Sequence, residues 1–308
     1  MKTYKTIFTF FLLLLFMTTL PFKADANKKV FKVLIADGNV EVIRNLNKTV
    51  KIYPGNELFS KDTILAVGDI YLCLYHKAGV VYEINKPGKY SISQIESTFE
   101  VTKNNFVSKY VDFLIEAMKE DNEENERFKL GIERELFDEN KIATLMPRNT
   151  KFFGDVIRFI WFSKPNNPEY TLVLKNEFSE TVTTKKTNDT TLMVEILPLN
   201  LKKGSCYNWE VMNSEDESSM SNASYICLLN DEETEKVMNE LGNLSNNIIS
   251  GSGIVQELVH AQYFENEGLL MNAFECYERA ISIMPGLPEA NNAYRTFLVK
   301  HRLSNKEE

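Results

Sequence analysis

The sequence predicts a multidomain protein with an all-β N-terminal domain, a β-sandwich middle domain and an α-helical C-terminal unit. Short apolar runs separated by turn residues fill the regions 27–102 and 146–230 and are typical of β-strands. From residue 231 onward, apolar residues recur every three or four positions, which is typical of amphipathic helices. A chain of 308 residues also exceeds the size of one ordinary compact core, so several units are expected.

Residues 1–26 have the features of a secretory signal peptide. Lys2 and Lys5 give a positive start, the run 7–20 is apolar, and Ala24 and Ala26 are small residues suited to cleavage. The apolar run is shorter than the roughly 20 residues that span a bilayer. We therefore expect cleavage, a location in the periplasm or at the cell exterior, and no integral membrane segment after cleavage. The sequence leaves open whether the leader is instead kept as an anchor.

The first β domain, 27–102, contains seven runs with strand character, separated by residues that favour tight reversals, such as Gly38 and Gly68. Tyr71 and Tyr75 share one face of a strand by the period of two. That face serves either cross-strand packing or recognition, and we retain both tyrosines as candidate partner contacts. The expected strands are 31–35, 39–43, 49–53, 63–66, 71–76, 80–84 and 90–95.

Residues 103–145 are expected to form an acidic helical connector. Apolar residues recur at helical spacing over 106–118 and again over 128–136. Between residues 116 and 139 there are ten acidic and four basic residues. This charge predicts a solvated helical face, and a surface for a basic partner is the alternative.

The middle domain, 146–230, has six expected strands with the length and spacing of an immunoglobulin-like or fibronectin-like sandwich. Trp161 and Trp209 are expected to fill its core. Cys206 and Cys227 flank a polar stretch, and a hairpin turn there would place them opposite each other. They then form either a disulfide, which export permits, or a pair of small core side chains. The expected strands are 156–162, 169–174, 181–186, 190–196, 206–212 and 223–229.

The C-terminal unit, 231–303, is expected to contain a helix from residue 231 and three more helices over 254–267, 270–283 and 288–302. The sequence Ser250-Gly251-Ser252-Gly253 separates the first helix from the second and is interpreted as a linker. The polar tail 304–308 is expected to be disordered.

The first domain carries short motifs of strand and turn residues at 38–42, 54–58, 61–64, 71–74 and 81–84. Together these segments resemble the FecR-type domain, a small β domain of bacterial envelope proteins. Periplasmic FecR regulators of sigma factors also carry a cytoplasmic region and a membrane helix, which have no counterpart in this sequence. The resemblance therefore implies an envelope module, with signalling or sensing as an alternative role.

Two further resemblances concern the rest of the chain. The segments 160–161, 170–172 and 204–211 are similar to sandwich domains found beside FecR-type domains. The pair of helices after Gly253 resembles one tetratricopeptide repeat, from which Glu257 and His260 depart. Its aromatic positions Phe264 and Tyr277 are candidate partner contacts. The repeat pattern is carried by Ala261, Phe264, Gly268, Ala273, Tyr277, Ala280 and Pro285.

The sequence contains no recognisable catalytic, cofactor-binding or metal-binding motif. Its net charge of -8 argues against binding to nucleic acid, which depends on basic patches. We therefore expect a non-catalytic exported protein-interaction or scaffold protein, with no cofactor, whose partners are envelope proteins or surface polymers. The alternatives are a FecR-like sensing component and, less favoured, an exported hydrolase acting on glycan.

Overall fold

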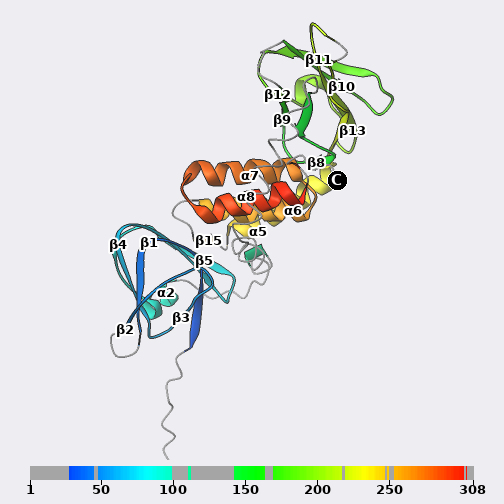
Figure 1. Ribbon diagram of the computed structural model, residues 1–308. Helices are drawn as coiled ribbons and strands as arrows, with labels where there is room; N and C mark the ends of the chain where they lie inside the picture. Colours follow the sequence, from blue (N-terminus) through cyan, green and yellow to red (C-terminus); the bar gives the residue numbers. More distant parts are fainter. Residues whose placement is uncertain are drawn as a thin grey trace, which may run out of the picture.

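The computed structural model describes residues 28–44, 48–98, 110–111, 142–163, 169–216, 219–246, 248–249, 253–301 and 303. Strands dominate the N-terminal part and helices the C-terminal part, which confirms the predicted β-rich and helical arrangement (Figure 1). The leader, most of the acidic connector and the tail 304–308 lie outside the described residues. In the part of the chain that the structure describes, no helix has the length and apolar character needed to cross a membrane.

The first β unit is a seven-stranded sheet with the order β15-β5-β4-β1-β2, in which β3 also pairs with β1 and β6 with β4. A short helix, α2 (Ile92–Ser97), follows β6. The strands are β1 (Lys29–Arg44), β2 (Lys48–Lys51), β3 (Glu57–Phe59), β4 (Thr63–His76), β5 (Val80–Ile84), β6 (Gly88–Ser91) and β15 (Ile248–Ile249).

The structure corrects two expectations for this sheet. The segments 31–35 and 39–43 form one strand, and so do 63–66 and 71–76. Gly38 and Gly68 have φ angles of 81° and 75°, and a register shift follows Gly38, so these glycines bend two long paired strands rather than reverse the chain. The segment 90–95 is also not one strand, because the helix α2 begins at Ile92.

The two faces of the first sheet belong to different cores. Leu72 and Leu74 pack with Val33 in a core that lies within the β unit. On the opposite face of β4, Tyr71 and Tyr75 belong to the core cluster that also contains the C-terminal helices. The sheet is therefore buried on both faces along this part of β4.

The second β unit contains a five-stranded sheet, β11-β10-β13-β14-β8, and a three-stranded sheet, β12-β9-β7. Aromatic rings of the two sheets contact each other, with Phe159 4.9 Å from Trp209 and Trp161 5.6 Å from Tyr170 between ring centroids. Both tryptophans are buried, as expected. The strands are β7 (Ala143–Met146), β8 (Thr150–Phe152), β9 (Val156–Phe162), β10 (Tyr170–Lys175), β11 (Thr181–Thr187), β12 (Thr191–Glu195), β13 (Cys206–Asn213) and β14 (Ser224–Leu228).

The C-terminal helices are α5 (Asp231–Ser245), α6 (Ile254–Asn266), α7 (Leu270–Ile283) and α8 (Pro288–Lys300). Helix α5 begins with a capping box, in which the Asn230 side chain accepts from the Glu233 N–H and the Glu233 side chain accepts from the Asn230 N–H. The helices lie between the two β units (Figure 1). The last unit in the sequence is therefore the middle unit in space.

Specific contacts fix the helices to both β units. The Thr150 hydroxyl of β8 lies 3.0 Å from the Gly268 carbonyl oxygen and accepts from the Leu270 N–H at 2.8 Å, at the start of α7. Arg158 of β9 pairs with Glu278 of α7. On the other side, β15 lies between α5 and α6 in the sequence and pairs in parallel with β5. The helices therefore contact both β units, including the first β unit, which is far from them in the sequence.

Candidate functional site

The four aromatic residues expected to contact a partner are all buried. Tyr71 and Tyr75 lie on the face of β4 that shares a core with the helices. The Phe264 ring is 6.1 Å from the ring of Phe153 in the second β unit, and Tyr277 packs within α6–α8. Tyr71, Tyr75 and Phe264 thus pack where units of the chain meet, Tyr277 packs inside the helical unit, and none of the four forms an exposed contact surface.

The three histidines do not converge on a common site. The described residues contain no group of three histidine, cysteine or acidic side chains with metal-binding geometry. Burial lowers the pKa of His76 and that of His260, which keeps both rings neutral near pH 7. The polar partners are Glu96 for His76, Ser245 for His260 and Glu265 for His301.

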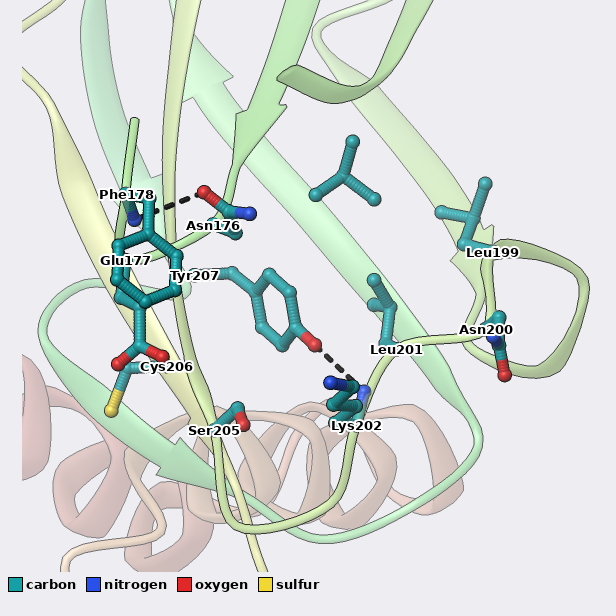
Figure 2. A pocket seen from close by; sticks show the side chains of 11 residues that line it. Asn176, Glu177, Phe178, Leu199, Asn200, Leu201, Lys202, Ser205, Cys206 and Tyr207 are labelled. Atoms are coloured by element: carbon teal, nitrogen blue, oxygen red, sulfur yellow. Dashed lines mark hydrogen bonds between the residues drawn. The ribbon is translucent and has the colours of Figure 1, made fainter. Parts of the chain in front are cut away.

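The second β unit contains an open groove with a volume of about 200 Å³. It lies between the turn that joins β10 to β11 and the loop that leads from the short 3-10 helix η1 (Leu197–Leu199) to β13. Figure 2 shows the ring of Tyr207 in the middle of the groove, with Phe178 on one side and Leu201 on the other. The lining residues are Asn176, Glu177, Phe178, Val182, Leu199, Asn200, Leu201, Lys202, Ser205, Cys206 and Tyr207.

Side-chain hydrogen bonds shape the turn on one side of the groove. The Asn176 Oδ1 accepts from the Phe178 N–H at 3.0 Å and from the Glu180 N–H at 2.9 Å (Figure 2 draws the first). This Asx-type turn reverses the chain within a few residues, and Ser179 takes a positive φ of 62° to complete it. Phe178 is consequently held at the tip of the turn, where neither sheet covers it.

The loop on the other side is fixed by a different set of bonds. Asn200 adopts a left-handed conformation with φ of 52° and its N–H donates to the Leu197 carbonyl, which ends η1. The Tyr207 hydroxyl then accepts from the Lys202 N–H at 2.7 Å (Figure 2). Hydrogen bonds within the chain thus fix both walls of the groove.

The two most exposed large apolar side chains of the described residues are Phe178, which lines the groove, and Leu197, which begins η1 two residues before the lining residue Leu199. Leu197 in η1 is 81% exposed and Phe178 is 75% exposed. Single exposed apolar residues are common, but Phe178 lies in the lining of a partly apolar groove, which makes this face a candidate for covering by a partner. The arrangement supplies apolar contact area together with the side-chain amide of Asn200.

A disulfide joins β13, at the edge of the groove, to β14. Strand register pairs Cys206 of β13 directly with Cys227 of β14, and the structure joins their sulfur atoms. Cys206 also lines the groove. The other two cysteines, Cys73 and Cys276, are free and buried, and burial raises the pKa of both thiols, which leaves them unreactive.

No family model matches the sequence, and no curated protein matches it either. Phe178 and Leu197 did not stand out from the sequence, because isolated apolar residues in turns have no periodicity. The only signals were a phenylalanine inside the polar turn 176–180 and a leucine directly before Pro198.

Proposed function

We propose that this chain is a non-catalytic exported protein of the cell envelope that binds a partner protein through the groove of its second β unit. The exposure of Phe178 in the lining of the groove carries the proposal, together with that of Leu197 in η1, the short helix from which the opposite wall leads. Covering apolar surface is worth roughly 25 cal/mol per Å², so a partner that places an apolar side chain against Phe178 and Leu201 in the groove gains affinity.

In this proposal the three units have separate roles. The first is a FecR-like β unit, the second is an immunoglobulin-like sandwich that carries the groove, and the helices form a single tetratricopeptide-like unit. Contact between the two sheets through Phe159 and Trp209 supports the sandwich. Buried Ala261 and Ala273 at the junction of α6 and α7 support the repeat-like pair. The helices act as a scaffold that holds the groove in a fixed position relative to the first unit.

The experiment compares capture of envelope proteins by three forms of the full chain. The groove variant combines Phe178→Ser with Leu197→Ser, and the control is Met238→Ser, which changes a side chain on α5 that is 60% exposed. We expect the wild type and the control to retain the same cross-linked partner from an envelope extract, and the groove variant to lose it. Far-UV circular dichroism and the melting temperature should be the same for all three proteins.

Equal recovery of the partner by the groove variant, or no specific partner with the wild type, would contradict the proposal. Deletion of the segment 254–302 is a poor alternative test. The helices in it share a core with both β units, so the deletion would expose that core rather than remove one contact surface.

A further inference from the structure

The smaller sheet of the second β unit ends in a free edge at β12. Its order is β12-β9-β7, and no described strand pairs with the other side of β12. The opposing sheet has five strands and ends at β11. At the other end of the smaller sheet, the hydroxyl of Thr144 in β7 lies 2.9 Å from that of Ser224 in β14, so β12 lies on the β11 side. Figure 1 shows β11 at the end of the unit away from the helices. The two sheets therefore differ in width at this edge.

The hydrogen-bond pattern shows which backbone groups of β12 face the free edge. The Trp161 N–H donates to the Thr190 carbonyl, and the Ile196 N–H donates to the Asp155 carbonyl. Bonded pairs alternate along an antiparallel ladder, so Leu192 and Val194 are the β12 residues bonded to β9. The N–H and C=O groups of the alternate residues point away from β9, toward the edge. These residues are Thr191, Met193 and Glu195.

The opposing strand β11 is left uncovered at the same place. Lys185 is paired in register with Leu172, and Thr183 with Leu174. Residues directly opposite each other share a sheet face, and both leucines are buried in the core, so Lys185 lies on the inward face. Lys185 is nevertheless exposed and forms no ion pair among the described residues. A fourth strand in the smaller sheet would cover this lysine.

The edge strands of the two sheets also differ in the residues that discourage pairing with another chain. Natural edge strands carry lysine, proline or bulges that discourage pairing with another chain. Strand β11 carries Lys185 and Lys186, whereas β12 has the sequence Thr-Leu-Met-Val-Glu, with Glu195 at its end as its single charge. Met193 in the middle of β12 is 60% exposed. The edge of β12 is thus apolar, regular and open to strand addition.

We infer that β12 accepts an extended segment of a partner protein as an added strand. The segment would carry a carboxylate opposite Lys185 and an apolar side chain at the groove end, where Val182 of β11 lines the hollow. Backbone hydrogen bonds to the edge supply affinity, and the lysine and the groove supply specificity. The inference rests on the proposed function and names the chemistry of the partner.

The test uses a synthetic peptide of roughly eight residues, an ordinary strand length, that alternates valine and glutamate and ends in leucine. A matched peptide has lysine in place of glutamate. Binding of each labelled peptide to the full chain is measured by fluorescence anisotropy. Amide hydrogen exchange of the ¹⁵N-labelled protein is followed by NMR with and without the acidic peptide.

The decisive variant is Met193→Pro, which removes an N–H that points to the free edge and leaves the ladder to β9 intact. Met193→Val keeps that N–H and is the control. We expect the acidic peptide to bind the wild type and Met193→Val, at least tenfold tighter than the lysine peptide, and to bind Met193→Pro at least tenfold more weakly. Exchange of the amides of Thr191, Met193 and Glu195 should slow when the acidic peptide is added.

Undiminished binding to Met193→Pro, unchanged exchange at the three amides, or no binding by the wild type would overturn the inference. Slow exchange at these amides without peptide, together with a doubled mass in sedimentation, would overturn it by showing that two copies pair through β12. If capture from the envelope extract depends on Phe178 but the peptide assay fails, the groove proposal stands and strand addition fails.

Discussion

The side chain of Asn272 forms two hydrogen bonds with the backbone of Phe153. Its Oδ1 accepts from the Phe153 N–H at 3.0 Å, and its Nδ2 donates to the Phe153 carbonyl oxygen at 2.5 Å. The side-chain amide thus satisfies the backbone N–H and C=O of Phe153, directly after β8, as a neighbouring strand would. Because Asn272 lies in the first turn of α7, the pair joins the helical unit directly to the second β unit.

Substitution Asn272→Ala should therefore destabilise the protein. It removes both bonds and leaves a donor and an acceptor of Phe153 without their partner, which costs roughly 2–4 kcal/mol when each group loses about 1–2 kcal/mol. Urea denaturation followed by circular dichroism measures the change. The control Asn266→Ala alters an exposed residue of α6 and should shift stability by less than about 0.5 kcal/mol. An equal loss of stability from the two substitutions would contradict a stabilising role for the Asn272–Phe153 hydrogen bonds.

Two glycine-to-alanine substitutions should change the free energy of unfolding in opposite directions. Gly38 has a φ of 81°, and a Cβ there would lie 2.4 Å from the Asp69 carbonyl oxygen, so Gly38→Ala should cost more than the roughly 1–2 kcal/mol of the left-handed conformation alone. Gly242 lies in α5, where an added Cβ would meet no other side chain within 4 Å, and Gly242→Ala should add about 0.5–1 kcal/mol. Melting curves of both variants check the signs, and a Gly38→Ala protein as stable as the wild type would contradict the bend.

The buried carboxylate of Glu265 should make stability depend on pH. Burial acts to raise its pKa, but hydrogen bonds from His301 at 2.9 Å and Lys300 at 2.7 Å outweigh burial and hold the pKa below its ordinary value of 4.5. The folded state then binds the proton more weakly than the unfolded state. The carboxylate's contribution is therefore complete above pH 4.5 and is lost as the pH falls through the folded pKa.

Substitution Glu265→Gln tests this contribution. At pH 7 we expect a loss of roughly 1–3 kcal/mol, because the neutral amide replaces a charged acceptor. The difference from the wild type should shrink as the pH is lowered below 4.5 in urea titrations. Glu267→Gln, which breaks a more exposed pair with Lys236, should cost less than about 1 kcal/mol at pH 7. A difference that stays constant with pH would contradict the assignment to Glu265.

Loss of the Cys206–Cys227 bond should lower the free energy of unfolding by about 3 kcal/mol, since it closes a loop with a sequence separation of 21 residues. The double variant Cys206→Ser, Cys227→Ser measures this loss. Dithiothreitol should destabilise the wild type to the same extent and leave the double variant unchanged. The denatured wild type should expose two reactive thiols before reduction, those of Cys73 and Cys276. Four thiols before reduction would contradict the bond.

Much of the local structure could be predicted from the sequence because periodicity is a local property. The helix expected over 270–283 is α7 (Leu270–Ile283), and the strand expected over 156–162 is β9 (Val156–Phe162). The strand boundaries in the first β unit were predicted wrongly where one residue type suits two backbone conformations. Gly38 suits both a tight turn and a bend within a strand, and only pairing with β4 selects the bend.

The candidate site was less accessible to sequence analysis. The four aromatic residues expected to contact a partner follow helix or strand periodicity. Aromatic residues with such periodicity lie on the apolar face of their element, and that face is the one buried in the core. Phe178 lies in a turn and Leu197 in the three-residue helix η1, and both elements are too short to give a periodic signal. Their exposure follows from how the turn and the loop after η1 are held.

The sequence by itself determined that a β-rich part precedes a helical part, because apolar spacing of two or of three to four residues selects strand or helix locally. Tertiary structure alone decided that the helices lie between the two β units, that Tyr71 and Tyr75 are buried against them, and that β12 is left as an open edge. These outcomes depend on contacts between residues far apart in the chain. No local pattern encodes which apolar face will cover another.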